Sequence, residues 1–141
     1  MEAVKALVTI SGMQNGENGP ESVRFATEGR FSKKGQAYKI EYDESELTGL
    51  EGTHTTILAG SKSVALKRIG KVESYLSFIP GKKQMSYYQT EFGSFVVGID
   101  PYEIDIALTD FGGRIHVGYH VEIDHSETGF NVLDVIVKPI Y

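Results

Sequence analysis

The chain has 141 residues, of which 40% are hydrophobic and 23% are charged, and its formal net charge is −5. A length near 150 residues predicts one domain with its own core, here over residues 1–141. This composition excludes a disordered chain and a bundle of membrane helices. The basic pairs are isolated and the chain is mildly acidic, whereas nucleic-acid binding needs a contiguous basic surface. We therefore expect no nucleic-acid partner.

The sequence contains no cysteine. Disulfides, thiolate nucleophiles and cysteine-type zinc sites are therefore excluded, which fits a reducing compartment. Residues 1–13 carry Lys5 inside an apolar stretch and lack the long apolar run of a signal peptide, and no segment approaches a membrane-spanning length. We expect a cytoplasmic protein with no membrane partner.

Apolar and polar residues alternate with a period of two along most of the chain, the pattern of half-buried β-strands. In chain order the apolar faces comprise Val4, Ala6, Val8 and Ile10; Val23, Phe25 and Phe31; Tyr38, Ile40 and Tyr42; Tyr102, Ile104, Ile106 and Leu108; and Ile115, Val117, Tyr119, Val121 and Ile123. Turn-forming glycine, proline and asparagine residues separate these blocks about every ten residues. The one helix-like stretch, residues 43–47, is too short for a regular helix.

The pattern predicts an all-β fold of about 8–10 antiparallel strands with little or no helix. Open antiparallel sheets of that size tend to close, because closure removes their unpaired edges. We therefore favour a single β-barrel over a sandwich.

Residues 130–139 are apolar on both faces. Phe130, Val132 and Ile136 share one face with Asp134, and residues of the same kind occupy the other. A strand that is apolar on both sides is covered on both sides. Either the N-terminal strand or a second chain would cover it, so a homodimer is one expectation.

The histidines do not predict a metal site. On a strand, His116 and His120 lie about 13 Å apart along one face, whereas zinc holds its nitrogen ligands within about 2.1 Å. The sequence around His54 and His125 shows no cluster of acidic or histidine residues. No nucleophile elbow or phosphate-binding loop is present either. We expect no metal, no cofactor and no catalytic residue.

Arg68 shares an apolar face with Val64 and Leu66. If that face points inward, the guanidinium enters the barrel, where leaving it unpaired costs several kcal/mol. It would then need a carboxylate, carbonyl groups or an anionic ligand, and Asp134 is one conceivable partner. Alternatively, Arg68 lies near a strand end and reaches solvent.

The eight tyrosines could either line a cavity or fill the core. A barrel of about eight strands is only just wide enough for packed side chains or one small ligand. The leading hypothesis is a non-enzymatic barrel that binds a small amphipathic or anionic molecule in its interior. Its predicted polar contacts are Arg68, Tyr38, Tyr42, Tyr88 and Tyr119.

Two alternatives remain open. One is a structural or interaction module with a filled barrel that acts as a homodimer. The other is an enzyme with a Tyr/Arg/Glu site at the barrel mouth and Glu41 as the base. Glu41 alternates with Tyr38, Tyr42 and Ile40, so its side chain should point away from them.

Several short motifs together resemble a known family. They are residues 38–44, Gly52 with Thr53, residues 64–70, Phe78, residues 88–90 with Gly93, and residues 113–115 leading to Tyr119. Over nearly the whole chain they resemble the DUF1934 (YwiB-like) family of small uncharacterised bacterial proteins. The resemblance implies a calycin-like, lipocalin-type β-barrel and a bacterial cytoplasmic setting, and it implies no established activity.

Overall fold

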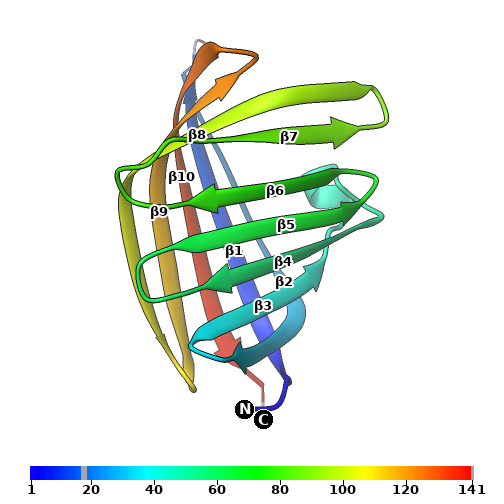
Figure 1. Cartoon of the computed structure of the whole chain (residues 1–141). Coiled ribbons are helices and arrows are strands. Elements are labelled where there is room, and N and C mark those ends of the chain that lie inside the picture. The colour runs from blue at the N-terminus through cyan, green and yellow to red at the C-terminus, as the bar shows by residue number, and fades with distance from the viewer. Residues whose placement is uncertain (17–18, 141) are drawn as a thin grey trace.

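Ten antiparallel strands close into one barrel in the computed structural model. The structure describes residues 1–16 and 19–140. Within these ranges it describes every side chain except those of residues 15, 16, 19, 20, 127 and 128. The strands are β1 (Val4–Gly16), β2 (Gly19–Lys34), β3 (Ala37–Asp43), β4 (Thr53–Ala59), β5 (Val64–Gly70), β6 (Glu73–Phe78), β7 (Gln84–Thr90), β8 (Gly93–Thr109), β9 (Gly112–Ile123) and β10 (Ser126–Pro139). Each strand pairs with its neighbours in sequence, and β1 pairs with β10 to close the barrel (Figure 1). The predicted antiparallel barrel is confirmed, and the sandwich alternative is wrong.

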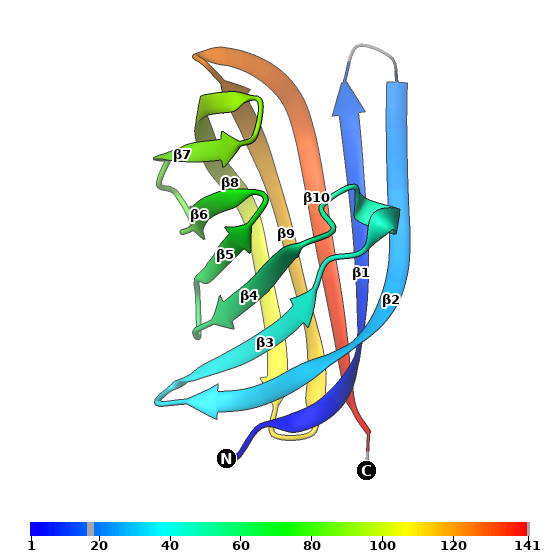
Figure 2. The same ribbon diagram turned by 90° about the vertical axis from the view of Figure 1, so that its right-hand side faces the viewer.

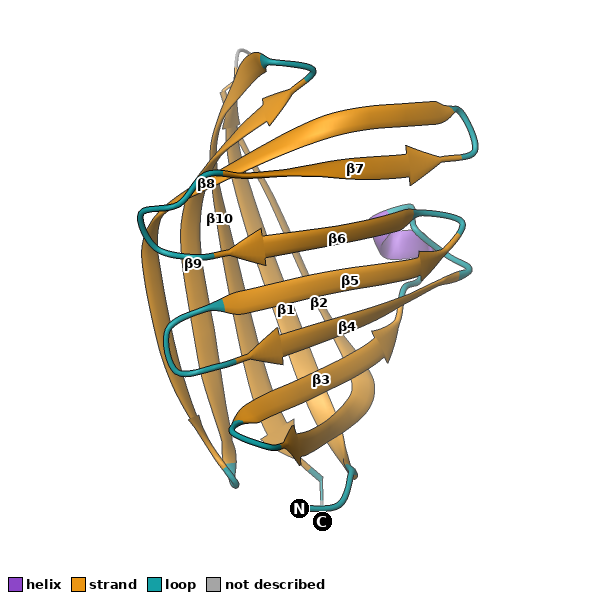
Figure 3. Cartoon of the chain, viewed as in Figure 1, coloured by secondary structure: helices purple, strands orange, loops and turns teal. Residues whose placement is uncertain are grey.

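Helical structure in residues 1–16 and 19–140 is limited to one 3-10 turn, η1 (Glu46–Thr48), between β3 and β4 (Figure 3). The Ser45 side chain caps this turn by accepting a hydrogen bond from the Leu47 N–H at 3.2 Å, and Gly49 ends it with a positive φ of 74°. Within that same described part, no helix is long and apolar enough to cross a membrane.

The inward-facing side chains form rows across neighbouring strands, because residues that pair directly lie opposite one another on the same face. One such row is apolar and buried, and it runs from β2 to β6: Phe31, Ile40, Ile57, Leu66 and Leu76. On β9 the inward face carries Ile115, Val117 and Val121, all buried as the alternation predicts. These rows form the hydrophobic core that underlies the candidate site.

The two ends of the barrel differ. Both termini lie at one end, and the β1–β2 and β9–β10 connections lie at the other (Figures 1 and 2). At this second end, Val23, Phe95 and Ile123 lie on the inward side of their strands and are nevertheless 53%, 39% and 40% exposed. We call this the open end, because interior apolar side chains reach solvent there.

The two-sided strand β10 keeps only one face in the core. Val135 and Val137 point inward and are buried, whereas Phe130 and Ile136 are exposed on the outer face. The expectation that the N-terminal strand covers this outer face is wrong, because β1 lies beside β10 in the same sheet. Coverage by a second chain stays a prediction.

Candidate functional site

A row of mainly polar side chains crosses five neighbouring strands in the barrel interior. Its members pair directly from strand to strand: Tyr42 on β3, Thr55 on β4, Arg68 on β5, Ser74 on β6 and Tyr88 on β7. We call this row the polar belt. It lies one step along the barrel from the apolar row that contains Ile40 and Leu66, so the belt borders the hydrophobic core.

Glu44 joins the belt from the segment between β3 and η1. Its backbone N–H donates a hydrogen bond to the Thr53 carbonyl at 2.9 Å, which holds the segment against the start of β4. The side chain is buried, with only 7% of the residue exposed. It lies within hydrogen-bonding reach of Thr55 and Tyr42, and close enough to Arg68 for that charge to influence its protonation. The belt therefore combines one carboxyl group with one guanidinium.

Several polar atoms of the belt are buried without a hydrogen-bond partner of good geometry in the described part of the chain. They are Glu44 Oε1, Thr55 Oγ1, Arg68 Nε and Ser74 Oγ. Thr55 is fully buried, Ser74 is 8% exposed, and no ion pair within 4.0 Å joins Arg68 to a described carboxylate. An unsatisfied buried polar atom typically costs about 1–3 kcal/mol. Four of them in one row mark a place where an additional molecule could supply the missing partners.

Burial dominates the electrostatics of this row. It raises the pKa of Glu44 above its ordinary value of 4.5, although the nearby charge of Arg68 opposes the shift. Burial and then the charge of Glu44 raise the pKa of Tyr42, and burial raises that of Tyr119. The tyrosine hydroxyls are therefore neutral near pH 7, and Glu44 is easier to protonate than an exposed glutamate.

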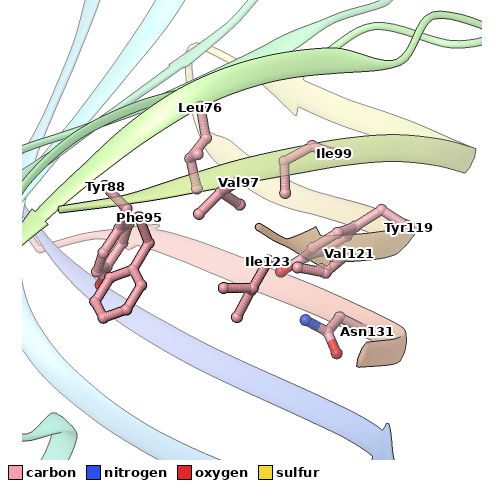
Figure 4. Close-up of a pocket in the computed structure, with 9 residues that line it drawn as sticks. All are labelled: Leu76, Tyr88, Phe95, Val97, Ile99, Tyr119, Val121, Ile123 and Asn131. Carbon is pink, nitrogen blue, oxygen red and sulfur yellow. The ribbon is translucent and has the colours of Figure 1, made fainter. Parts of the chain in front are cut away.

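An apolar cavity of about 350 Å³ lies beside the belt. Its lining is drawn in Figure 4: Leu76, Tyr88, Phe95, Val97, Ile99, Tyr119, Val121, Ile123 and Asn131. Tyr88 belongs to both the belt and the cavity, and the pKa of Tyr119 responds to the charge of Arg68. Belt and cavity are therefore neighbouring parts of one interior space. Its volume lies at the lower end of the range for small-molecule sites.

The structure brings together four of the five predicted contact residues: Arg68, Tyr42, Tyr88 and Tyr119. Tyr38 lies elsewhere. Its ring stacks on Phe31 with centroids 5.3 Å apart, and its hydroxyl donates a 2.6 Å hydrogen bond to Asp110 in the β8–β9 turn. That turn is at the end of the barrel where the termini lie, away from the open end (Figure 1).

The suggested pairing of Arg68 with Asp134 is wrong. Asp134 points outward from β10 and contacts His116 Nδ1 at 2.6 Å, while Glu103 lies 3.4 Å from the other ring nitrogen of His116. The carboxyl group whose pKa responds to the charge of Arg68 is that of Glu44. The two faces of β10 are both apolar, so the sequence around Asp134 did not indicate which of them points inward.

Glu41 lies on the outer surface, where its carboxylate is 3.4 Å from Lys39 Nζ and 3.3 Å from His54 Nε2. The same histidine contacts Asp43 at 2.9 Å. The sequence beside His54 shows no acidic cluster, and the fold nevertheless places two carboxylates next to it. Pairing across β3 and β4 brings together residues 11 and 13 positions apart in sequence. Across the described residues, no group of three or more histidine, aspartate or glutamate side chains is arranged to hold a metal ion.

Thr55, Ser74 and Glu44 were missed by the sequence analysis. Thr55 and Ser74 lie at every second position with the buried apolar residues of their strands, so the period of two places them on the same inward faces. Their significance appears only when the register aligns them with Arg68. Glu44 lies two residues after Tyr42 but beyond the end of β3, where strand periodicity no longer applies.

Comparison with known proteins bears on the fold and the family. The model of the family described as "Domain of unknown function (DUF1934)" matches residues 8–135. The crystal structure of the ywiB protein from Bacillus subtilis is similar, with a TM-score of 0.88, 17% sequence identity, and coverage of 99% of this chain and 94% of that chain. No curated protein matches. The match of the family model over most of the chain shows that this protein belongs to the DUF1934 family.

Proposed function

We propose that the barrel binds a small amphipathic or anionic molecule in its interior, without catalysis. The observation that carries this proposal is a group of four buried polar atoms without a hydrogen-bond partner of good geometry, beside an apolar cavity. Arg68 Nε and Ser74 Oγ are the two that also lie outside the contacts among Tyr42, Glu44 and Thr55. Buried polar groups in folded proteins are normally satisfied, so such a group calls for an explanation. The polar head group of such a molecule would supply hydrogen-bond partners to the belt, and its apolar portion would fill the cavity.

The open end supports access to this site. Phe95 and Ile123 line the cavity and are also partly exposed to solvent, so the space continues to the surface. In the proposed complex, Arg68 and the hydroxyls of Thr55 and Ser74 contact the head group. Tyr88 and Tyr119 orient the molecule at the boundary between the belt and the cavity.

The proposal is tested by titration with 1-anilinonaphthalene-8-sulfonate, an anionic aromatic amphiphile whose fluorescence reports binding. Val121→Phe fills the cavity and should weaken binding at least tenfold, and Arg68→Met should weaken it by a similar factor. Lys67→Met is the matched control, because Lys67 is exposed on the opposite face of β5. It should bind as the wild type does. Unchanged binding by both Arg68→Met and Val121→Phe would end the proposal.

The homodimer alternative is favoured by one separate observation. Leu7 on β1 and Ile136 and Phe130 on β10 are apolar and exposed on the outer face of the barrel. A second copy that packed there would bury them. Light scattering at high protein concentration tests this alternative, and a strict monomer would count against it.

The enzymatic alternative changes its candidate base. Glu41 lies outside the barrel, whereas Glu44 is buried next to Tyr42 and Arg68. A buried carboxyl group with a raised pKa is the kind of group that acts in acid–base chemistry. Any Tyr/Arg/Glu site in this protein would therefore use Glu44.

A further inference from the structure

We propose that the head group held by the polar belt is a singly charged anion of the carboxylate class, and that Glu44 takes up a proton as this anion binds. The inference rests on the proposed function and specifies the chemistry of the same site.

The donor and acceptor character of the belt points to an anion. Of its four atoms without a well-placed partner, Arg68 Nε can only donate a hydrogen bond. The Ser74 hydroxyl can donate one as well, and the Thr55 hydroxyl is a further donor that lies within reach of Glu44. A cationic head group could not satisfy the guanidinium, whereas each carboxylate oxygen can accept from two donors.

Glu44 is the member of the belt that opposes an anion. As a carboxylate it only accepts hydrogen bonds, and its charge offsets that of Arg68. Once protonated it becomes a fourth donor, and the row then carries the single positive charge of Arg68. Burial already raises the pKa of this carboxyl group, which lowers the cost of protonation.

The geometry also limits the charge of the ligand. Arg68 and Glu44 do not form an ion pair within 4.0 Å in the described structure, so the guanidinium is not already engaged by a carboxylate. One guanidinium can compensate one buried negative charge, whereas a doubly charged group would leave one charge unpaired in the interior. The adjoining cavity, about 350 Å³ and mostly apolar, suits the hydrocarbon part of such a molecule.

Glu44 is the group in the belt whose charge we expect to change, because burial raises its pKa above the ordinary value of 4.5. It faces Tyr42 on β3, Thr55 on β4 and Arg68 on β5. Phenols and guanidinium groups ordinarily titrate near pH 10 and above pH 12. His54 is a second titratable group nearby, and its hydrogen bond with Asp43 raises its pKa above 6.5, but it points outward from β4. It therefore provides a control position.

The experiment compares decanoate with decanol, two probes with the same tail and different head groups, by isothermal titration calorimetry. Titrations between pH 6 and pH 8, in buffers of different ionisation enthalpy, measure the protons taken up. We expect decanoate to bind the wild type at least tenfold more tightly than decanol at pH 6. In the range where Glu44 is ionised in the free protein, uptake should approach one proton, and the Kd should rise by up to tenfold per pH unit.

Two variants locate the effect. Glu44→Gln cannot take up the proton, so its decanoate affinity should be independent of pH and, at pH 8, higher than that of the wild type. His54→Gln should keep the pH dependence of the wild type. If Glu44→Gln does not fold, the number of protons that the wild type and His54→Gln take up on binding decanoate still tests the inference. Equal uptake of about one proton by both would support it, and no uptake by either would overturn it.

The outcomes separate this inference from the proposed function. One outcome is that decanoate and decanol bind equally well without proton uptake, and that Val121→Phe binds neither probe. This outcome would overturn the inference and leave interior binding supported. Tight decanoate binding without proton uptake would overturn the role of Glu44. Failure of both probes to bind would overturn the inference, and unchanged dye binding by Val121→Phe and Arg68→Met would then end the proposed function as well.

Discussion

Replacing both charged members of the polar belt should stabilise the protein while removing its binding site. In the double variant Arg68→Met with Glu44→Met, two of the four buried atoms without a well-placed partner disappear together with both charges. Replacing buried charges with apolar residues of similar volume is commonly neutral or stabilising by about 1–4 kcal/mol. We expect a gain of that size in the free energy of unfolding. The melting temperature should rise by roughly 2–4 °C for each kcal/mol.

Urea unfolding at pH 7, followed by circular dichroism, measures this gain as a higher midpoint with an unchanged slope. The control Lys67→Met should stay within about 0.5 kcal/mol of the wild type, because Lys67 is exposed. Arg68→Met alone leaves the buried Glu44 without its nearby cation, so this variant should be less stable than the double variant. A double variant less stable than the wild type by about 3 kcal/mol would refute the reasoning, because it would show that the belt is a stabilising network.

Two further predictions concern the scaffold. Hydrogen bonds with Asp134 and then Glu103 raise the pKa of His116 above 6.5, so its contribution to stability should be fully present below that pH and lost as pH rises through the folded-state pKa. Melting of His116→Gln at pH 5 and pH 9 checks this, and an equal loss at both pH values would contradict it. Gly113 has a φ of 142°, and a β-carbon there would collide with the Ala107 carbonyl oxygen. Gly113→Ala should therefore lower the urea midpoint far more than the control Gly35→Ala, where φ is 63° and no atom lies within 4 Å. Similar losses in the two variants would contradict this prediction, because they would show that the backbone around Gly113 shifts to make room for the β-carbon.

The sidedness of the strands was predictable from the sequence because strand periodicity is local. Alternation placed Ile115, Val117 and Tyr119 on one face of a strand, and that face is the interior. The same rule placed Arg68 beside Val64 and Leu66. It failed to choose a side for β10, where Val135 and Ile136 are both apolar and neither face is marked. The prediction that Tyr102 shares a face with Ile104, Ile106 and Leu108 is wrong, because an irregularity between Pro101 and Glu103 breaks the alternation and the exposed Tyr102 packs on His120 and Phe130 outside the barrel.

The site itself depends on register, which the sequence pattern does not specify. Thr55 and Ser74 oppose Arg68 because the β4–β5 and β5–β6 turns set those alignments. Glu44 reaches the belt from the position between the end of β3 and the capped turn, outside any periodic segment. Tyr38 shares a face with Tyr42, but four positions along a strand carry it toward the other end of the barrel. Facing direction was thus predictable, whereas position along the barrel was not.

A crystal structure of the protein with decanoate tests the central claim most directly. The account predicts density inside the barrel, with the carboxylate about 3 Å from Arg68 Nε and the hydrocarbon tail among Val97, Val121 and Ile123. An Arg68 side chain that extends into solvent beside a cavity filled by the protein's own side chains would contradict it.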